Sequence, residues 1–201
     1  ARCIAIYIHD KGLSRKKAVK VKTLNRSLLL TIHDDDEVSV DMGIPEFNPA
    51  LIPFLSETTL STYQRSILIS GKESLLLFSA LSMGNPHAVI FVEDLRKTAV
   101  KDIGEALGTH TDFPEGVNVS FMEIVSRREI QLRVFERGAG ETLACGSGAC
   151  AAVVAGRMLE KLDPLVQVNL PGGQLKVSWN LRDSVIMRGP TQTVYEGIIE
   201  L

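Results

Sequence analysis

Short runs of aliphatic and β-branched residues, separated by polar and glycine-containing turns, dominate the chain and predict strands. Near the start, residues 18–23, 26–33 and 37–42 alternate in part between apolar and polar positions. The acidic triplet at 34–36 lies between the last two runs. Because three consecutive carboxylates cannot all point the same way, we interpret the triplet as a solvated hairpin tip rather than a metal site.

The rest of the chain continues this pattern, with two helical segments. Residues 50–60 look like a linker, 98–107 favour a polar helix, and Ala149–Leu159 favour a helix whose small residues allow close burial. Pro171-Gly172-Gly173 predicts a hairpin turn. Further strands are predicted at residues 64–70, 74–81, 87–92, 117–124, 129–136, 164–170, 174–180, 184–188 and 196–201. The whole pattern predicts a strand-dominated α+β fold with helices buried against a curved sheet.

Composition limits the partners and the compartment. With 201 residues, 45% of them hydrophobic, the chain can bury a sizeable core in one large domain or two small ones. A net charge of −2 argues against nonspecific binding to nucleic acid or to an anionic membrane. Since no apolar run is long enough to span a bilayer and the start lacks the order of a secretory signal, we expect a soluble, cytoplasmic protein.

Cysteine usage favours a reducing compartment, because three cysteines do not form a disulfide framework. Cys145 and Cys150 lie five residues apart across a glycine turn, and no nearby Cys/His pair completes a zinc pattern. We therefore expect no metal.

Cys145 is the strongest candidate for chemistry, since it lies where the helix at Ala149–Leu159 is expected to begin. Unpaired N–H groups and the helix dipole there favour a thiolate and bind carboxylate or phosphate. Gly146 lets the backbone approach a ligand closely, and Ser147 is either the N-cap or a ligand contact. The alternative is that the thiol is only a buried apolar filler.

Two loops add polar candidates. Asn85 and His87 lie between two predicted strands, where the amide can bind a carboxylate or amine and the imidazole can deprotonate a thiol. Asn118 interrupts an apolar strand, so its amide must hydrogen-bond to backbone or ligand. Glu136 and Arg137 end a strand just before the glycine loop and supply a carboxylate and a fork for a substrate carboxylate. An Asn-Pro turn, a structural histidine and a surface ion pair are the alternative interpretations.

These segments resemble the diaminopimelate epimerase family, the cofactor-independent racemases of the lysine and cell-wall pathway. The matching blocks fall in the family's order and at roughly its spacing, at residues 84–89, 118–121, 136–142, 144–150, 171–173 and 187–190. The resemblance implies two similar units, each a curved and mostly antiparallel sheet around a central helix, with the active site between them. We expect residues 1–47, with a returning strand at 191–201, to form an incomplete first unit, and residues 48–190 to form the second.

The resemblance also implies the reaction, which is epimerisation of LL-diaminopimelate to meso-diaminopimelate by two thiols on opposite faces of the α-carbon. Cys145 would be one thiol and Glu136 would tune it, while His87 would assist the opposite cysteine. Arg137 would meet the distal end of the substrate. The residues expected to bind substrate are Asn85, Asn118, Glu136, Arg137, Gly146 and Ser147. No cofactor is expected, the partner is this small-molecule substrate, and a homodimer is compatible with the resemblance.

The chain departs from the family at its start. The family's other catalytic cysteine belongs to a Cys-Gly-Asn-Gly-x-Arg-Cys motif, and Ala1-Arg2-Cys3 match only its last three residues. We expect the sequence to be a fragment whose second thiol would precede Ala1, with Cys3 buried on a helix and not acting as the base. Residues 1–201 alone are then not expected to epimerise.

Three other functions stay open at this point. A proline racemase-like enzyme would racemise a different amino acid. A cysteine hydrolase using Cys145 and His87 would form an acyl-enzyme without exchanging a substrate α-hydrogen. A noncatalytic binding or assembly module of the same fold would bind diaminopimelate without exchange.

Overall fold

The structure, a computed structural model, describes residues 1–23 and 27–199 and separates into two compact units. Unit 1 comprises residues 1–41 and 188–201, and unit 2 comprises residues 42–187. The boundaries expected from the sequence, after residues 47 and 190, lie a few residues later in the chain. Strand β12 (Ile186–Gly189) spans the second boundary.

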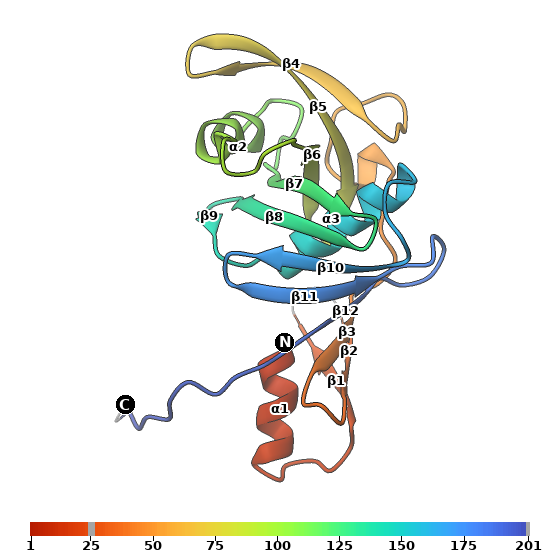
Figure 1. Ribbon diagram of the computed structural model, residues 1–201, viewed down its shortest axis with the longest axis vertical. Helices are drawn as coiled ribbons and strands as arrows, with labels where there is room; N and C mark the ends of the chain where they lie inside the picture. Colours follow the sequence, from red (N-terminus) through yellow and green to blue (C-terminus); the bar gives the residue numbers. More distant parts are fainter. Residues whose placement is uncertain (24–26, 200–201) are drawn as a thin grey trace. The chain divides into compact units, whose positions relative to one another are not determined.

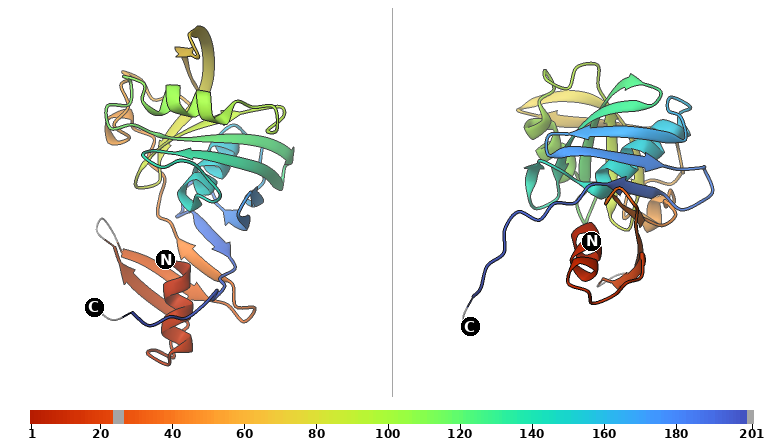
Figure 2. Two further views of the ribbon diagram at one scale, coloured as in Figure 1. Left: turned by 90° about the vertical axis from the view of Figure 1, so that its left-hand side faces the viewer. Right: turned by 60° about the horizontal axis from the view of Figure 1, so that its bottom comes forward.

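Unit 1 combines helix α1 (Arg2–Asp10) with an antiparallel sheet of β1 (Ala18–Lys22), β2 (Ser27–Ile32) and β3 (Val38–Asp41). The helix packs against β2 and β3, on one face of this sheet (Figure 2). These strands confirm three predicted runs, except that residue 26 lies outside the described residues. The acidic triplet forms the turn between β2 and β3, as predicted.

Two expectations for unit 1 are wrong. Cys3 is exposed rather than buried, because α1 buries Ala5 and leaves neighbours such as Ile4 and Tyr7 exposed. The expected returning strand at 191–201 is not formed over residues 191–199, and the last two positions lie outside the described residues. A strand needs a hydrogen-bonded neighbour, whereas apolar side chains of this segment are solvent-exposed.

Unit 2 contains a larger sheet in the order β11-β10-β8-β7-β6-β5-β4 (Figure 1). Its pairs are antiparallel except β6 with β7 and β8 with β10, and β9 pairs with β8. The strands are β4 (Tyr63–Ile69), β5 (Lys72–Ser82), β6 (Pro86–Phe91), β7 (Asn118–Ser126), β8 (Glu129–Glu136), β9 (Gly140–Thr142), β10 (Leu165–Leu170) and β11 (Gly173–Ser178). A short 3₁₀ helix at Pro49–Leu51 precedes them. The α+β prediction is thereby confirmed, although β9 was not predicted.

Helices α2 (Val100–Gly108) and α3 (Gly146–Met158) cover opposite faces of β8. A Cβ placed on Gly104 of α2 would meet Phe135, and one placed on Gly148 of α3 would meet Val134. Adjacent strand residues point to opposite faces, so the two helices lie on either side of the sheet. Helix α3 packs against β5, β6, β7, β8 and β11, which makes it the central helix of the unit. Among the described residues, no helix is long and apolar enough to cross a membrane.

The close approach of α2 to the sheet depends on Gly104. A Cβ at this position would lie 2.4 Å from the Phe135 ring, whereas one at Gly108 of the same helix would meet nothing closer than 3.5 Å. We expect Gly104→Ala to lower the free energy of unfolding by about 1–3 kcal/mol through overpacking. Gly108→Ala should be neutral or slightly stabilising because alanine favours a helix. Urea denaturation of both variants tests this, and equal stabilities would contradict it.

Candidate functional site

Cys145 is the N-cap of helix α3, immediately before Gly146. The predicted helix is confirmed but starts three residues earlier than expected, and Ser147 is a first-turn residue rather than the N-cap. Gly148 in this first turn packs closely against Val134 and Ser120 of the sheet. The first N–H groups of a helix have no intrahelical partner, so this end favours a negatively charged group.

The sulfur lies between the first turn of α3 and the sheet. A Cβ built on Gly148 would lie 3.3 Å from Cys145 Sγ, 3.2 Å from Ser120 Oγ and 3.1 Å from Val134 Cγ2. The side chains of β7 and β8 therefore meet the thiol at a point where only glycine fits without a shift. Cys145 is only 5% exposed.

Burial raises the pKa of the Cys145 thiol to about 11. The Gly148 N–H and the Ser147 hydroxyl, whose oxygen is 3.7 Å from the sulfur, act in the opposite direction. The Glu136 carboxylate raises this pKa further by hydrogen bonding and by its charge. Thr142 Oγ1 in turn donates a hydrogen bond to Glu136 Oε1. Glu136 is therefore held where its charge favours the protonated form of the Cys145 thiol.

Alkylation of Cys145 by iodoacetamide should be slow at neutral pH and should rise about tenfold per pH unit from about pH 7 upward, since the thiolate is the reactive form. The rate should level off near the thiol pKa of about 11. Peptide fragmentation distinguishes Cys145 from Cys3, whose exposed thiol serves as the control in the same sample. A plateau below about pH 8 would contradict the raised pKa.

Asn118 is the structural link between two loops of the site. Its Nδ2 donates to the carbonyl of Pro86 at 2.9 Å, and its Oδ1 accepts from the N–H of Arg137 at 3.1 Å. These partners fix the orientation of the amide, because Pro86 can only accept and the N–H can only donate. The side chain is 4% exposed. The prediction that this amide must find a partner is confirmed, with backbone groups as the partners.

His87 is fully buried at the start of β6, opposite Asn118 of β7. Its Nε2 lies 3.1 Å from Asn85 Oδ1, while Nδ1 has no partner among the described residues. Burial, and to a smaller extent the charge of Arg137, lower the pKa of His87 to about 3. The imidazole is therefore neutral near pH 7 and positions the Asn85 amide.

Arg137 follows β8 and holds its guanidinium against another loop. Its Nη1 donates to the carbonyl of Glu115 at 2.6 Å, and its side chain packs against Gly116, where a Cβ would lie 3.0 Å from Cδ. The guanidinium retains further N–H donors, which suit a carboxylate. Gly172 fixes the loop before Cys145, because its N–H donates to the Leu143 carbonyl at 2.7 Å.

The predicted site residues all lie in unit 2 and form two connected groups. Asn85, His87, Asn118 and Arg137 are linked by hydrogen bonds and by strand register. The second group, around the N-terminus of α3, consists of Cys145, Gly146, Ser147 and Glu136. The groups meet where Glu136 precedes Arg137 at the end of β8.

Sequence reasoning missed Thr142 and Ser120. Thr142 lies in the unpredicted strand β9. Ser120 is two residues from Asn118, a spacing that puts both side chains on one face of a strand and that was available from the sequence. Across residues 1–23 and 27–199, no cluster of three or more His, Cys, Asp or Glu could hold a metal ion.

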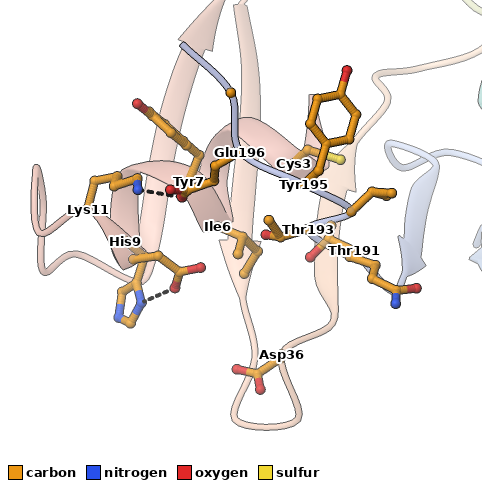
Figure 3. A pocket seen from close by; sticks show the side chains of 14 residues that line it. Cys3, Ile6, Tyr7, His9, Lys11, Asp36, Thr191, Thr193, Tyr195 and Glu196 are labelled. Atoms are coloured by element: carbon orange, nitrogen blue, oxygen red, sulfur yellow. Dashed lines mark hydrogen bonds and ion pairs between the residues drawn. The ribbon is translucent and has the colours of Figure 1, made fainter.

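Unit 1 has a cavity of its own, of about 860 Å³, between α1 and residues 191–197 (Figure 3). Its lining includes Cys3, His9 and the ion-paired side chains of Lys11 and Glu196. The His9 and Asp10 side chains also pair, at 3.7 Å. These groups are largely exposed, so their interactions are weak, in contrast to the buried groups around Cys145.

Comparison with known proteins gives consistent results. A family model described as diaminopimelate epimerase matches residues 79–194. The curated diaminopimelate epimerase of Nitrosomonas europaea is 47% identical over 202 residues, covering 100% of this chain and 72% of that protein.

Solved structures share the fold at low sequence identity. A hydroxyproline epimerase from Agrobacterium vitis, with bound trans-4-hydroxy-L-proline, has a TM-score of 0.62 at 14% identity, over 94% of this chain and 62% of that one. This chain thus spans less than two thirds of that structure. A putative phenazine biosynthesis protein from Clostridium difficile has a TM-score of 0.60 at 12% identity, over 99% and 71%. At these identities the structural similarity shows the fold alone.

Proposed function

This chain belongs to the diaminopimelate epimerase family, and we propose on that basis that it takes part in interconverting the LL and meso isomers of diaminopimelate, with Cys145 exchanging the α-proton on one face of the substrate. The observation that carries the proposal is the buried Cys145 thiol at the N-terminus of α3, next to the Glu136 carboxylate that tunes its protonation. A thiolate formed there is close to N–H groups that stabilise a substrate carboxylate.

The chemistry requires these features. An amino-acid α-proton is weakly acidic, and negative charge develops on the adjacent carboxylate as it leaves. Cys145, as the thiolate, takes the α-proton from one face of the substrate and becomes the thiol, while Glu136 tunes its protonation. Inversion of the carbon also requires an acid that delivers a proton from the opposite face. Cys150 is not that acid, because it is fully buried within α3.

The remaining residues bind and orient the substrate in this proposal. The helix N-terminus, with Gly146 and Ser147, binds the carboxylate next to the reacting carbon. Arg137, anchored by the Glu115 carbonyl, binds the distal carboxylate, and Asn118 holds the Arg137 backbone in place. His87, neutral near pH 7, orients Asn85 toward the substrate and can assist proton transfer on the opposite face.

Substrate selectivity tests this function. In deuterium oxide, the protein should incorporate deuterium at an α-carbon of LL-diaminopimelate, while L-proline and L-lysine should stay unlabelled. Proline has no distal carboxylate for Arg137. The distal end of lysine carries an ammonium group but no carboxylate. Labelling of proline in preference to diaminopimelate would favour the proline racemase-like alternative.

A homodimer and a cytoplasmic location stay predictions that accompany this proposal. Sedimentation equilibrium of the purified protein tests the first, and cell fractionation tests the second.

A further inference from the structure

Ser120 is a buried polar residue that the proposed mechanism does not yet use. It lies on β7, two residues from Asn118, and its side chain is fully buried. Its hydroxyl has no hydrogen-bond partner among residues 1–23 and 27–199. Buried hydroxyls are normally satisfied, because losing water without gaining a partner is unfavourable. A buried hydroxyl without a partner is explained when its hydrogen-bond acceptor forms only during the reaction.

The hydroxyl faces the first turn of α3, where the Cys145 sulfur lies. Ser120 Oγ and Cys145 Sγ lie 3.2 and 3.3 Å from one point, the position of a Cβ on Gly148. Val134, directly opposite Ser120 on β8, closes the same space with a methyl group and offers no acceptor. The hydroxyl and the sulfur therefore border the same space beside Gly148, where the sulfur is an acceptor once the thiol is ionised.

We propose that Ser120 is a positioning residue for Cys145, its hydroxyl donating a hydrogen bond to the sulfur when the thiol loses its proton. The inference deepens the proposed function and rests on it, since an epimerase needs this thiolate. A thiolate accepts several hydrogen bonds, and the Gly148 N–H and the Ser147 hydroxyl supply donors from the helix. Ser120 adds one from the sheet.

The other groups around the thiol do not replace this donor. Glu136 of β8 is negative and opposes ionisation of the thiol. His87 of β6 is on the same sheet face as Ser120, two positions along the register, and its free Nδ1 is not a donor when Nε2 carries the proton. Burial also disfavours the thiolate. A further neutral hydrogen-bond donor should therefore lower the pKa of the Cys145 thiol measurably.

The test is the pH profile of Cys145 alkylation in Ser120→Ala. The midpoint should move up by about one pH unit, so that alkylation below the midpoint is roughly tenfold slower while the maximal rate is unchanged. Ser79→Ala is the matched control, because Ser79 is also buried in this sheet but donates to the Ser61 carbonyl. It should leave the midpoint of Cys145 unchanged. An unchanged or lowered midpoint in Ser120→Ala would overturn the proposal.

A second pair of variants separates the hydroxyl from packing. Ser120→Thr and Ser120→Val have the same shape and perturb the crowded space beside Val134 equally, but only threonine retains the hydroxyl. Threonine should keep a lower midpoint than valine, and equal midpoints would overturn the proposal even if both variants are destabilised. Alkylation needs no substrate, so this result is independent of whether diaminopimelate is labelled in deuterium oxide, which tests the proposed function.

Discussion

Replacing Cys145 by alanine is expected to reduce α-hydrogen exchange of diaminopimelate by about a thousandfold or more, since it removes the group that takes the proton. Alanine fits where the cysteine was, and the buried thiol is neutral near pH 7. The free energy of unfolding should therefore change by only about 1 kcal/mol. The exchange rate is measured by mass spectrometry of substrate recovered from deuterium oxide, and stability is measured by urea denaturation.

Cys3→Ser is the control for this experiment. Cys3 is an exposed cysteine in unit 1, so its replacement should leave the rate of exchange unchanged. A Cys145→Ala variant that folds normally and retains the exchange rate of the unchanged protein would remove Cys145 from the mechanism.

Changing Asn118 to aspartate is expected to destabilise the protein by about 2–4 kcal/mol near neutral pH, because it puts a buried carboxylate against the Pro86 carbonyl. The Arg137 N–H keeps its acceptor, so the lost stability comes from the contact with the Pro86 carbonyl. The new carboxyl, with a raised pKa, can donate to Pro86 only when protonated. Its destabilising effect should therefore shrink as the pH falls from about 7 to about 5.

Asn48→Asp provides the comparison, since Asn48 Oδ1 accepts from the Ala50 N–H, a role that aspartate keeps, and the side chain is exposed. Its effect on the free energy of unfolding should be below about 1 kcal/mol. Urea denaturation at both pH values measures the two variants. Equal effects of the two substitutions, or a loss at Asn118 that does not depend on pH, would contradict the assigned orientation of the amide.

The strands were predictable because their apolar positions are continuous or alternate along the chain, as in β8, where Ile130, Leu132 and Val134 are buried. The bounds of helix α1 were not predictable, because its apolar residues do not form one buried face and several are exposed. Strand β9 has three residues around a glycine, too few for a pattern. The C-terminal residues have strand-like composition, but pairing depends on a partner strand that composition does not reveal.

The candidate site was predictable as a set of residues but not as a geometry. The glycines around Cys145 and the isolated Asn118 indicated a helix entrance and a satisfied amide, and both are found. Ser147 was one of two candidates, N-cap or ligand contact, because serine is a common cap, whereas the helix starts earlier and Cys145 is its N-cap. Burial of His87, which makes it neutral, and the unpartnered hydroxyl of Ser120 depend on how β6, β7 and α3 pack. Such packing is a tertiary property.

The most direct test of the central claim is α-hydrogen exchange by the protein itself. LL-diaminopimelate is incubated with the unchanged chain in deuterium oxide, and the recovered substrate is analysed for mass and label position. We predict deuterium at an α-carbon, with no label when Cys145→Ala is used or when protein is omitted. Binding of diaminopimelate without any label, or labelling that persists in Cys145→Ala, would contradict the account.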